Sequence, residues 1–199
     1  MQKDKSFESD ELEADIQEVV FTASEIQQRV SELGKEISKD YYNLNPLFVG
    51  VLKGVLFFMA DLLRMITIPV EVDFLAVSSY SSDARNRGMV RLDKDLGTLI
   101  TSRHVLFVED VIDTGLTLNY LLSTLRTRHP ASLEVCVLFD KPRVRLIDIP
   151  LKYKGFDLPD QFVVGYGLDL RERYRNLPFV GLLKSQILLN KISESDTSR

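Results

Sequence analysis

Residues 104–117 constrain the fold of this chain more than any other stretch. The apolar run 105–108, bounded by polar residues, predicts a strand that is buried on both faces of a parallel sheet. Glu109 and Asp110 follow where this strand should end, and after the small, hydroxyl-rich segment 113–117 leucines recur at helical spacing. The order is therefore strand, loop, helix. In open α/β sheets ligands bind outside the carboxyl ends of strands, where N–H groups at a helix start favour an anion.

The loop has the residues that a phosphate and a sugar need. Gly115 lets the backbone approach a phosphate closely, and Thr114 and Thr117 add hydroxyl donors. Glu109 and Asp110 suit the paired hydroxyls of a ribose, or a hard cation such as Mg²⁺. No Gly-Lys-Ser/Thr follows the glycine, and the several glycines of a dinucleotide fingerprint are missing, so neither motif applies. The loop predicts a ribose 5-phosphate as its ligand.

A structural role is the alternative, in which Asp113 or Thr114 simply caps the following helix. That interpretation would be preferred for an isolated Asp-Thr-Gly. Here hydrophobic residues, two acids, a third acid and hydroxyls come in a fixed order, which resembles the phosphoribosyl-diphosphate loop of the type I phosphoribosyltransferases. We therefore expect this loop to bind a ligand and not only to cap the helix.

The composition is that of an ordinary soluble protein, with 199 residues, of which 45% are hydrophobic and 27% charged. A net charge of -4 argues against nucleic-acid binding, and no apolar run approaches the ~18 residues of a membrane span. The single cysteine, Cys136, lies in an apolar run, so we expect a buried thiol and a reducing, cytoplasmic setting. We expect an acidic flexible segment over residues 1–18, one domain over 19–190 and a polar tail over 191–199.

Strands and helices alternate along the chain. Thr22, with Glu25 three residues later, forms a capping box that predicts a helix start. The pattern predicts an α/β fold, with a mainly parallel twisted sheet flanked by helices and a site along one rim of the sheet. The expected strands cover residues 47–52, 69–76, 89–92, 105–108, 133–139, 162–164 and 179–183, and the expected helices cover 22–41, 55–66 and the residues after 117.

Two further segments are candidates for the site. Lys53 and Gly54 follow the first core strand, where a glycine lets N–H groups approach a ligand and a lysine adds a cation; an ordinary turn is the alternative. Ser79, Tyr80 and the polar residues 81–88 have few apolar anchors, which is typical of a lid over an active site. A plain mobile hairpin without a role is the alternative for this segment.

Five motifs occur in one order along the chain, at residues 51–54, 79–80, 108–115, 140–142 and 162–175. Together they make the chain resemble the hypoxanthine-guanine phosphoribosyltransferases over most of its length. The resemblance implies a type I phosphoribosyltransferase fold, with a small hood formed by the terminal segments and a flexible lid loop. It also implies a purine-salvage enzyme that forms a homodimer or homotetramer.

The implied reaction transfers ribose 5-phosphate from phosphoribosyl diphosphate to N9 of hypoxanthine or guanine, giving IMP or GMP and diphosphate. The resemblance makes Asp113 the general acid/base near N7 of the base. It gives Glu109 and Asp110 to the ribose hydroxyls and Mg²⁺, and Asp169 to a second Mg²⁺. The other implied substrate contacts are Lys53, Gly54, Ser79, Tyr80, Val111, Ile112, Thr114, Gly115, Leu116, Thr117, Lys141, Gln161, Phe162, Val163, Leu168 and Arg175.

The resemblance gives several of these contacts a specific role. Lys53, Gly54 and Arg175 would meet the diphosphate, often with a cis peptide bond before the lysine, and residues 114–117 would hold the 5-phosphate. On the base side, Lys141 would donate a hydrogen bond to the 6-oxo group and Phe162 would stack on the purine. Backbone groups of Val163 would contact the 2-position, and Ser79 and Tyr80 would close over the reaction.

Two other functions are open on sequence alone. A regulatory relative that senses nucleotide or phosphoribosyl diphosphate without catalysis would keep the loop and lose base-site residues, whereas Asp113, Lys141 and Asp169 are all present. A phosphoacceptor signalling domain would need an acid pair near the first strand, which this chain lacks there. Val55 departs from the small residue that many relatives have after Lys-Gly, and whether it narrows the diphosphate loop is left open by the sequence. Hypoxanthine and guanine present the same 6-oxo acceptor, so a preference between them, or any use of xanthine, cannot be read from the sequence.

Overall fold

The computed structural model describes residues 9–79 and 90–188 of the chain. They form two compact units. The core unit is Gln27–Asp160, and the terminal unit combines Met1–Ile26 with Gln161–Arg199. The segment expected to form the lid, including Tyr80, lies outside the described residues except for its ends. No helix in the described ranges is long and apolar enough to cross a membrane.

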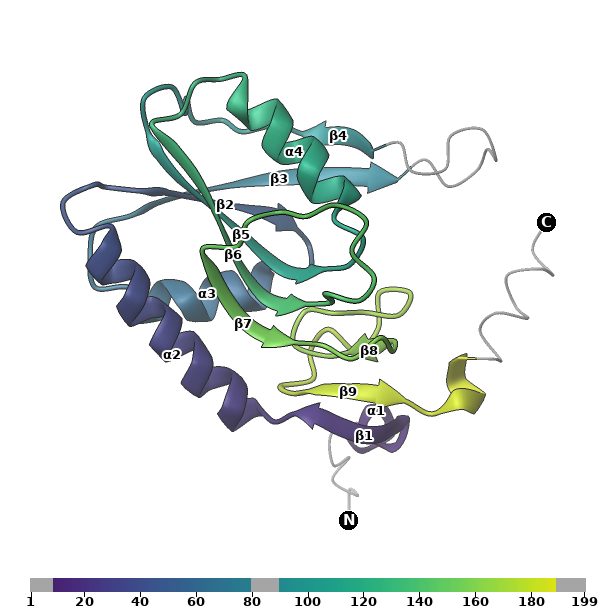
Figure 1. Cartoon of the computed structure of the whole chain (residues 1–199). Coiled ribbons are helices and arrows are strands. Elements are labelled where there is room, and N and C mark those ends of the chain that lie inside the picture. The colour runs from purple at the N-terminus through teal and green to yellow at the C-terminus, as the bar shows by residue number, and fades with distance from the viewer. Residues whose placement is uncertain (1–8, 80–89, 189–199) are drawn as a thin grey trace, which may run out of the picture. The chain divides into compact units, whose positions relative to one another are not determined.

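A six-stranded sheet in the order β4-β3-β2-β5-β6-β7 forms the centre of the core unit (Figure 1). All neighbouring strands are parallel except β3 and β4, which are antiparallel. This arrangement confirms the mainly parallel sheet expected from the sequence. The strands are β2 (Leu47–Leu52), β3 (Glu71–Ser79), β4 (Val90–Lys94), β5 (His104–Ile112), β6 (Ser132–Asp140) and β7 (Tyr153–Asp157).

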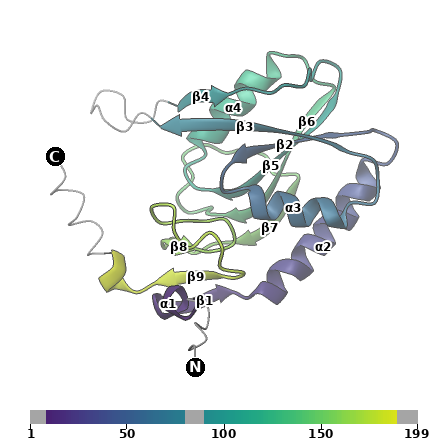
Figure 2. The same ribbon diagram turned by 180° about the vertical axis from the view of Figure 1, so that it is seen from behind.

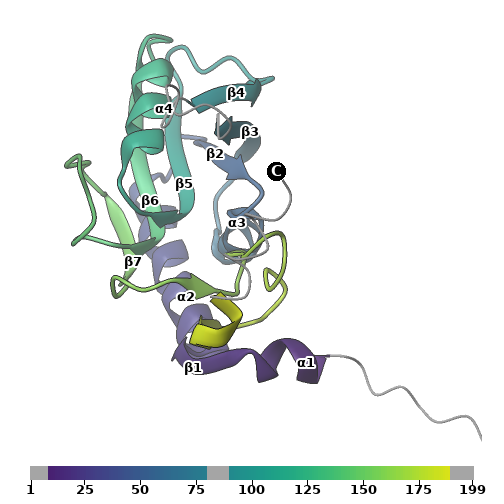
Figure 3. The ribbon, with the colours of Figure 1, turned by 90° about the vertical axis from the view of Figure 1, so that its right-hand side faces the viewer.

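One face of this sheet packs against α4 (Leu116–Arg126), and α3 (Leu56–Met65) lies on the other (Figure 3). The leucines of α4 recur at helical spacing and form one buried cluster with alternate residues of β2, such as Leu47 and Val49. Burying a leucine side chain is worth about 1.5–3 kcal/mol, so this face fixes the helix on the sheet. The buried leucines of α4 are Leu118, Leu121, Leu122 and Leu125.

The face toward α3 depends on two close approaches. A Cβ built on Gly50 of β2 would lie 2.9 Å from Val55 and 3.0 Å from Met59 of α3, so the glycine makes room for both side chains. A Cβ on Gly34 of α2 (Ala23–Asp40) would meet Met65 at the end of α3. The helices α2 and α3 therefore pack closely, as Figure 2 shows from behind.

The start of α2 has the capping box that the sequence predicts. The backbone N–H and the hydroxyl of Thr22 donate to the Glu25 carboxylate at 2.8 and 2.7 Å, and the N–H of Glu25 donates back to the Thr22 hydroxyl at 3.3 Å. These hydrogen bonds satisfy donors that a helix start leaves without intrahelical partners. The two hydrogen bonds that the Glu25 carboxylate accepts, that from the Thr22 hydroxyl first, also lower the pKa of Glu25 below its ordinary value.

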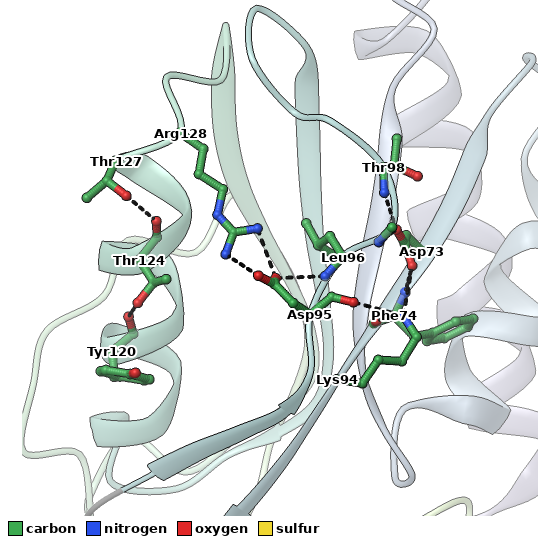
Figure 4. Close-up of polar contacts among 11 residues, drawn as sticks. Asp73, Phe74, Lys94, Asp95, Leu96, Thr98, Tyr120, Thr124, Thr127 and Arg128 are labelled. Carbon is green, nitrogen blue, oxygen red and sulfur yellow. Dashed lines mark hydrogen bonds and ion pairs between the residues drawn. The ribbon is translucent and has the colours of Figure 1, made fainter.

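Ion pairs hold the segment that follows β4 (Figure 4). Arg128 donates from two nitrogens to the two carboxylate oxygens of Asp95, at 2.9 and 2.8 Å. The carboxylate of Asp73 accepts the N–H groups of Gly97 and Thr98 at 2.8 and 2.9 Å. Burial opposes ionisation of Asp73, but these and other donated hydrogen bonds outweigh it, and the pKa of this carboxyl lies below its ordinary value.

The terminal unit is built from both ends of the chain. Its sheet has the order β1-β9-β8 with antiparallel pairing, and β1 (Ile16–Phe21) lies beside β9 (Val180–Leu183). The short strand β8 (Val163–Val164) completes the sheet. The terminal hood expected from the resemblance thus corresponds to a compact unit of its own.

The structure differs from the sequence expectation at the N-terminus. Residues 9–14, expected within an acidic flexible segment, form the helix α1 (Ser9–Ala14), and β1 follows at once. Leu12 and Ile16 pack against the buried cluster of the terminal unit, and the acid Asp15 accepts a hydrogen bond of 2.6 Å from the Tyr174 hydroxyl. The sequence did not predict this because the few apolar residues of the segment lie among many acidic ones.

Candidate functional site

The segment 113–117, which we call the predicted phosphate loop, lines one cavity of about 210 Å³ in the core unit. It lies where β5 ends and α4 begins. Gly115 is the N-cap of α4 and has a left-handed conformation with φ 80°, which a side chain would disfavour. The cavity is lined by Glu109, Val111, Ile112, Asp113, Thr114, Gly115, Thr117 and Leu118. The predicted residues Asp110 and Leu116 are not part of this lining.

No side chain caps α4 with a hydrogen bond. Asp113 is exposed, and the Thr114 hydroxyl accepts only a long hydrogen bond of 3.4 Å from the N–H of Leu116. The capping alternative for Asp113 therefore receives no support. The N–H groups of the first helical turn have no intrahelical acceptors and carry a partial positive charge, which suits an anion in the cavity.

Glu109 and Asp110 are successive residues near the end of β5 and have different surroundings, because Glu109 lines the cavity whereas Asp110 lies beside Gly54. Asp110 is buried, and its carboxylate accepts the N–H of Val111 at 2.8 Å. The Oε2 atom of Glu109 is buried and has no hydrogen-bond partner. Burial, with a smaller contribution from the negative charge of Asp110, raises the pKa of Glu109 well above its ordinary value. A cation or a hydroxyl donor from a ligand would satisfy this oxygen.

The Lys53-Gly54 turn follows β2 and meets β5 at the same edge of the sheet. A Cβ built on Gly54 would collide with the carboxylate of Asp110, so any larger residue would displace this side chain. The peptide bond between Leu52 and Lys53 is cis, as the resemblance implies. Val55 is fully buried against Gly50, so its side chain enters the core instead of narrowing the loop.

Lys141 comes from the next strand along the sheet. It follows β6, and its N–H donates to the carbonyl of Ile112 at the end of β5, at 3.0 Å. The parallel register of β5 and β6 pairs Ile112 with Asp140 and fixes this junction. The structure thus brings three predicted segments to one edge of the core unit: the Lys53-Gly54 turn, the phosphate loop and Lys141.

The carboxylates of this edge fit a metal only together with ligands from a substrate. Groups of three or more metal-binding side chains do not occur in the part of the chain that the structure describes. Glu109 offers one unpartnered oxygen and Asp110 a buried carboxylate beside it in sequence. Mg²⁺ commonly takes one or two protein carboxylates and completes its shell with waters and substrate oxygens. The residues present fit Mg²⁺ in that mode.

The remaining predicted base-site residues lie in the terminal unit. Gln161 and Phe162 are exposed, and Phe162 has a solvent exposure of 45%. Val163 pairs with Leu182 of β9, which holds its backbone in an extended conformation. Leu168 is buried and closes a tight turn through hydrogen bonds with Gly165 at 3.0 Å.

Asp169 and Arg175 contact each other inside the loop that follows β8. The Asp169 carboxylate pairs with Arg175 at 2.9 Å and accepts the N–H of Glu172 at 2.8 Å. Arg175 also donates to the carbonyl of Gly167 at 2.7 Å, while its buried Nε has no partner. Both side chains are therefore already used within the loop. Ser79, the predicted lid contact in the described part, is the last residue of β3 and pairs with Val90.

Two residues beside the site were not predicted as functional. Arg145 contacts the buried carboxylate of Asp140 with an Nη2–Oδ1 distance of 2.8 Å. Together they shape the loop after β6. The sequence signal was an acid at the end of a buried strand with an arginine five residues on, but this pattern is common in ordinary loops.

The chain matches the family model described as phosphoribosyl transferase domain over residues 18–171. The parallel sheet, the phosphate loop at the end of β5 and this match define the class of the protein, which is that of the phosphoribosyltransferases.

Individual relatives define the group within this class. Hypoxanthine-guanine phosphoribosyltransferases from Bacillus subtilis and Streptococcus agalactiae are 47% and 48% identical over 176 residues, which are 88% of this chain and 98% of each relative. A crystal structure of a hypoxanthine phosphoribosyltransferase from Staphylococcus aureus has a TM-score of 0.82 and 45% identity, and the match covers 88% of this chain and 97% of that one. The chain belongs to the hypoxanthine-guanine phosphoribosyltransferase family.

Proposed function

We propose that this enzyme transfers ribose 5-phosphate from phosphoribosyl diphosphate to N9 of hypoxanthine or guanine, with Mg²⁺ as cofactor, and thereby salvages purines. The observation that carries the proposal is the cavity at the end of β5, where a left-handed glycine, two threonines and a helix start surround space for one phosphate. Membership in the family supports the same reaction.

The residues of the core unit divide the phosphoribosyl group among them. The backbone from Thr114 to Thr117 binds the 5-phosphate, and the carboxylates of Glu109 and Asp110 bind the ribose hydroxyls. The Lys53-Gly54 turn binds the diphosphate, whose departure leaves a positively charged, oxocarbenium-like ribose. Bound Mg²⁺ supplies stabilisation of the negative charge on the leaving diphosphate. The cation of Lys53 adds to that stabilisation.

Each of the predicted base contacts has its own role. Asp113 exchanges a proton with N7, and the Lys141 ammonium donates a hydrogen bond to the 6-oxo oxygen. The exposed ring of Phe162 stacks on the purine, and backbone groups of Val163, with Gln161 and Leu168 nearby in the sequence, contact its far side. These roles account for selection of 6-oxopurines.

A role for Asp169 and Arg175 at Mg²⁺ and diphosphate requires a change in their contacts. Their ion pair of 2.9 Å would have to open, at least in part, because it now uses one carboxylate oxygen and one guanidinium nitrogen. The unpartnered Nε of Arg175 is a donor that the present loop does not use. We propose that diphosphate binding rearranges this pair.

The experiment that tests the function is an assay with phosphoribosyl diphosphate, Mg²⁺ and each purine base. A lysine ammonium only donates hydrogen bonds. It therefore pairs with the 6-oxo oxygen of hypoxanthine and guanine, whereas the 6-amino group of adenine would face it with a second donor. A site built for one group rejects an analogue lacking it by about 10⁴-fold or more. We expect turnover of both oxo bases and practically none of adenine.

The variant Lys141→Gln should lose most activity on the oxo bases and narrow the gap to adenine, because an amide presents either a donor or an acceptor. Lys39→Gln is the matched control, since Lys39 is exposed in the last turn of α2. A wild-type preference for adenine, or an unchanged kcat/KM of Lys141→Gln for hypoxanthine, would contradict the proposed base pocket.

A further inference from the structure

A buried ion pair lies behind the site in the core unit. The side chains of Asp140 and Arg145 are only 5% and 12% exposed, and both Nε and Nη2 of Arg145 lie 2.8 Å from the same carboxylate oxygen. Removing two charges from water is costly, and replacing such pairs with apolar residues is often neutral or stabilising. A contribution to stability is therefore a weak explanation of this pair.

Arg145 also closes the loop in which it lies. Its Nη1 donates to the carbonyl of Ile149 at 3.0 Å, while its other nitrogens contact Asp140 at the end of β6. One guanidinium thus connects the two ends of the segment 140–149. A planar fork with fixed donor directions is needed for this double contact, and only arginine offers it.

The closed loop contacts both the end of β5 and the phosphate loop. Lys141, its second residue, donates its N–H to Ile112 of β5, and the N–H of Leu146 donates to the carbonyl of Thr114, each at 3.0 Å. A Cβ built on Gly115 would lie 3.3 Å from the Ile149 side chain and 3.4 Å from the carbonyl oxygen of Ile147. The loop therefore supports the phosphate loop from behind.

We propose that Arg145 is a positioning residue that couples Lys141 to the phosphate loop through Asp140 and Ile149. It touches neither base nor phosphoribosyl group, and it sets the distance between the residues that do. The inference rests on the proposed function for its effect on turnover, but the geometric coupling stands on the contacts of the loop alone. Removing the fork should loosen binding of both substrates at once.

Two other pairs provide matched controls. Lys154 lies 3.9 Å from the second oxygen of Asp140, but it is 42% exposed and contacts Asp157 more closely, at 2.7 Å. The pair of Arg128 and Asp95 also uses two arginine nitrogens, here on the two oxygens of a more exposed carboxylate, and involves no loop of the site (Figure 4). Lys154→Gln and Arg128→Gln should keep KM for both substrates within about twofold of wild type.

The test compares Arg145→Gln with Arg145→Lys. A small misplacement of reacting groups costs about 10²-fold, so we expect kcat/KM of Arg145→Gln to fall by that order, with KM raised for both hypoxanthine and phosphoribosyl diphosphate. Amide hydrogen exchange of residues 113–117 should become faster in this variant and not in the controls. Lysine restores the charge but not the fork, so Arg145→Lys should fold well and remain impaired.

A paired variant covers the case in which Arg145→Gln does not fold. Asp140→Asn together with Arg145→Gln leaves no unpaired buried charge, and it should show the same rise in both KM values and the same faster exchange. Full activity in Arg145→Lys would overturn the proposal, because charge neutralisation alone would then suffice. Unchanged KM values and unchanged exchange in the glutamine variants would overturn it as well.

Failure of the proposed function gives a different result. If wild type transfers ribose 5-phosphate to no purine base, the proposed reaction is wrong, and the exchange rates of residues 113–117 still decide whether Arg145 holds the phosphate loop. If wild type is active, the kinetic and exchange measurements must agree for the coupling to hold.

Discussion

A missing side chain sets how closely two strand-end loops approach each other. Gly54 follows β2 and Asp110 lies on β5, and a Cβ on Gly54 would collide with the Asp110 carboxylate. Asp110 in turn is fixed by its contact with the N–H of Val111. The positions of the Lys53-Gly54 turn and of Asp110 therefore depend on each other.

The variant Gly54→Ala should show this dependence. Overpacking costs about 1–3 kcal/mol, and the shifted carboxylate should lower kcat/KM by about 10²-fold. Gly97→Ala is a matched control, because its added Cβ would find its nearest neighbour, Asp73, at 3.8 Å, an ordinary contact. Urea unfolding and turnover of both variants check the prediction, which fails if Gly54→Ala behaves like the control.

Asp113 gives the second prediction at the level of single residues. It is exposed and does not cap α4, so Asp113→Asn should leave the free energy of unfolding within about 0.5 kcal/mol of wild type. If Asp113 exchanges a proton with N7, kcat should fall by about 10²–10⁴-fold. Asp160→Asn, at an exposed loop position, is the control. A melt and a turnover assay on the same preparations separate the two effects, and an unchanged kcat would remove Asp113 from the mechanism.

Single elements show how far sequence patterns reach. The strand β2 was predicted with its observed bounds, and β5, β6 and β9 within a few residues, because continuous apolar runs match strands that are buried on both faces. The spacing of Thr22 and Glu25 likewise predicted a capping box, and the structure contains its reciprocal hydrogen bonds.

Other elements gave no comparable signal. The edge strand β7 contains Gly155, which reads as a turn in sequence. In the structure a Cβ on this glycine would collide with the carbonyl of Leu138, so glycine permits two strands to approach closely. The strand β1 is hidden among acids and is specified by its pairing with a distant strand, β9. In the site, the sequence predicted segments whose residues are contiguous. It did not predict the pair of Asp140 and Arg145, because that contact depends on the conformation of the loop between them.

The strand β5 also carries a pH dependence. The raised pKa of Glu109 means that folding takes up a proton between the ordinary value of about 4.3 and the raised value, so the free energy of unfolding falls as pH rises through that window. Each tenfold difference in proton affinity corresponds to about 1.4 kcal/mol. Relative to wild type, Glu109→Gln should therefore gain stability with rising pH above about 4.3.

Asp73 supplies a control of opposite sign. Its pKa is lowered in the folded chain, so its stabilisation is present above the ordinary value of about 3.9 and is lost as pH falls below it. Denaturant titrations of wild type, Glu109→Gln and Asp73→Asn across pH check both windows. A difference between wild type and Glu109→Gln that does not change with pH would contradict the assigned burial of Glu109.

At the scale of the whole molecule, the terminal unit depends on contacts between the two ends of the chain. Asp15 lies near the N-terminus and accepts the hydroxyl of Tyr174 at 2.6 Å. Burial and this hydrogen bond raise the pKa of Tyr174 to about 12. The hydrogen bond therefore persists in its present form throughout the neutral range.

Tyr174→Phe removes this connection and little else. Hydrogen bonds to charged groups are worth about 1.5–3 kcal/mol, and the free energy of unfolding should fall by that amount. The difference from wild type should be constant below pH ~10 and shrink toward pH 12, since the folded chain holds the phenol proton more tightly. Tyr120→Phe, at an exposed position of α4, should cause no such loss. Equal stability of Tyr174→Phe and wild type would show that the contact contributes nothing.

The pairing of β1 with β9 also has a consequence for protein synthesis. All strands of the core sheet lie within residues 27–160 and leave the ribosome before β9 does, whereas Ile16–Phe21 must wait for Val180–Leu183. At about 5–20 residues per second this wait lasts roughly 8–30 s. During it the nascent chain can complete its core unit, while an unpaired strand edge stays open to wrong partners. The terminal unit, which carries Phe162, forms last, so an interrupted translation product would contain Lys141 and the predicted phosphate loop but lack the ring proposed to stack on the purine.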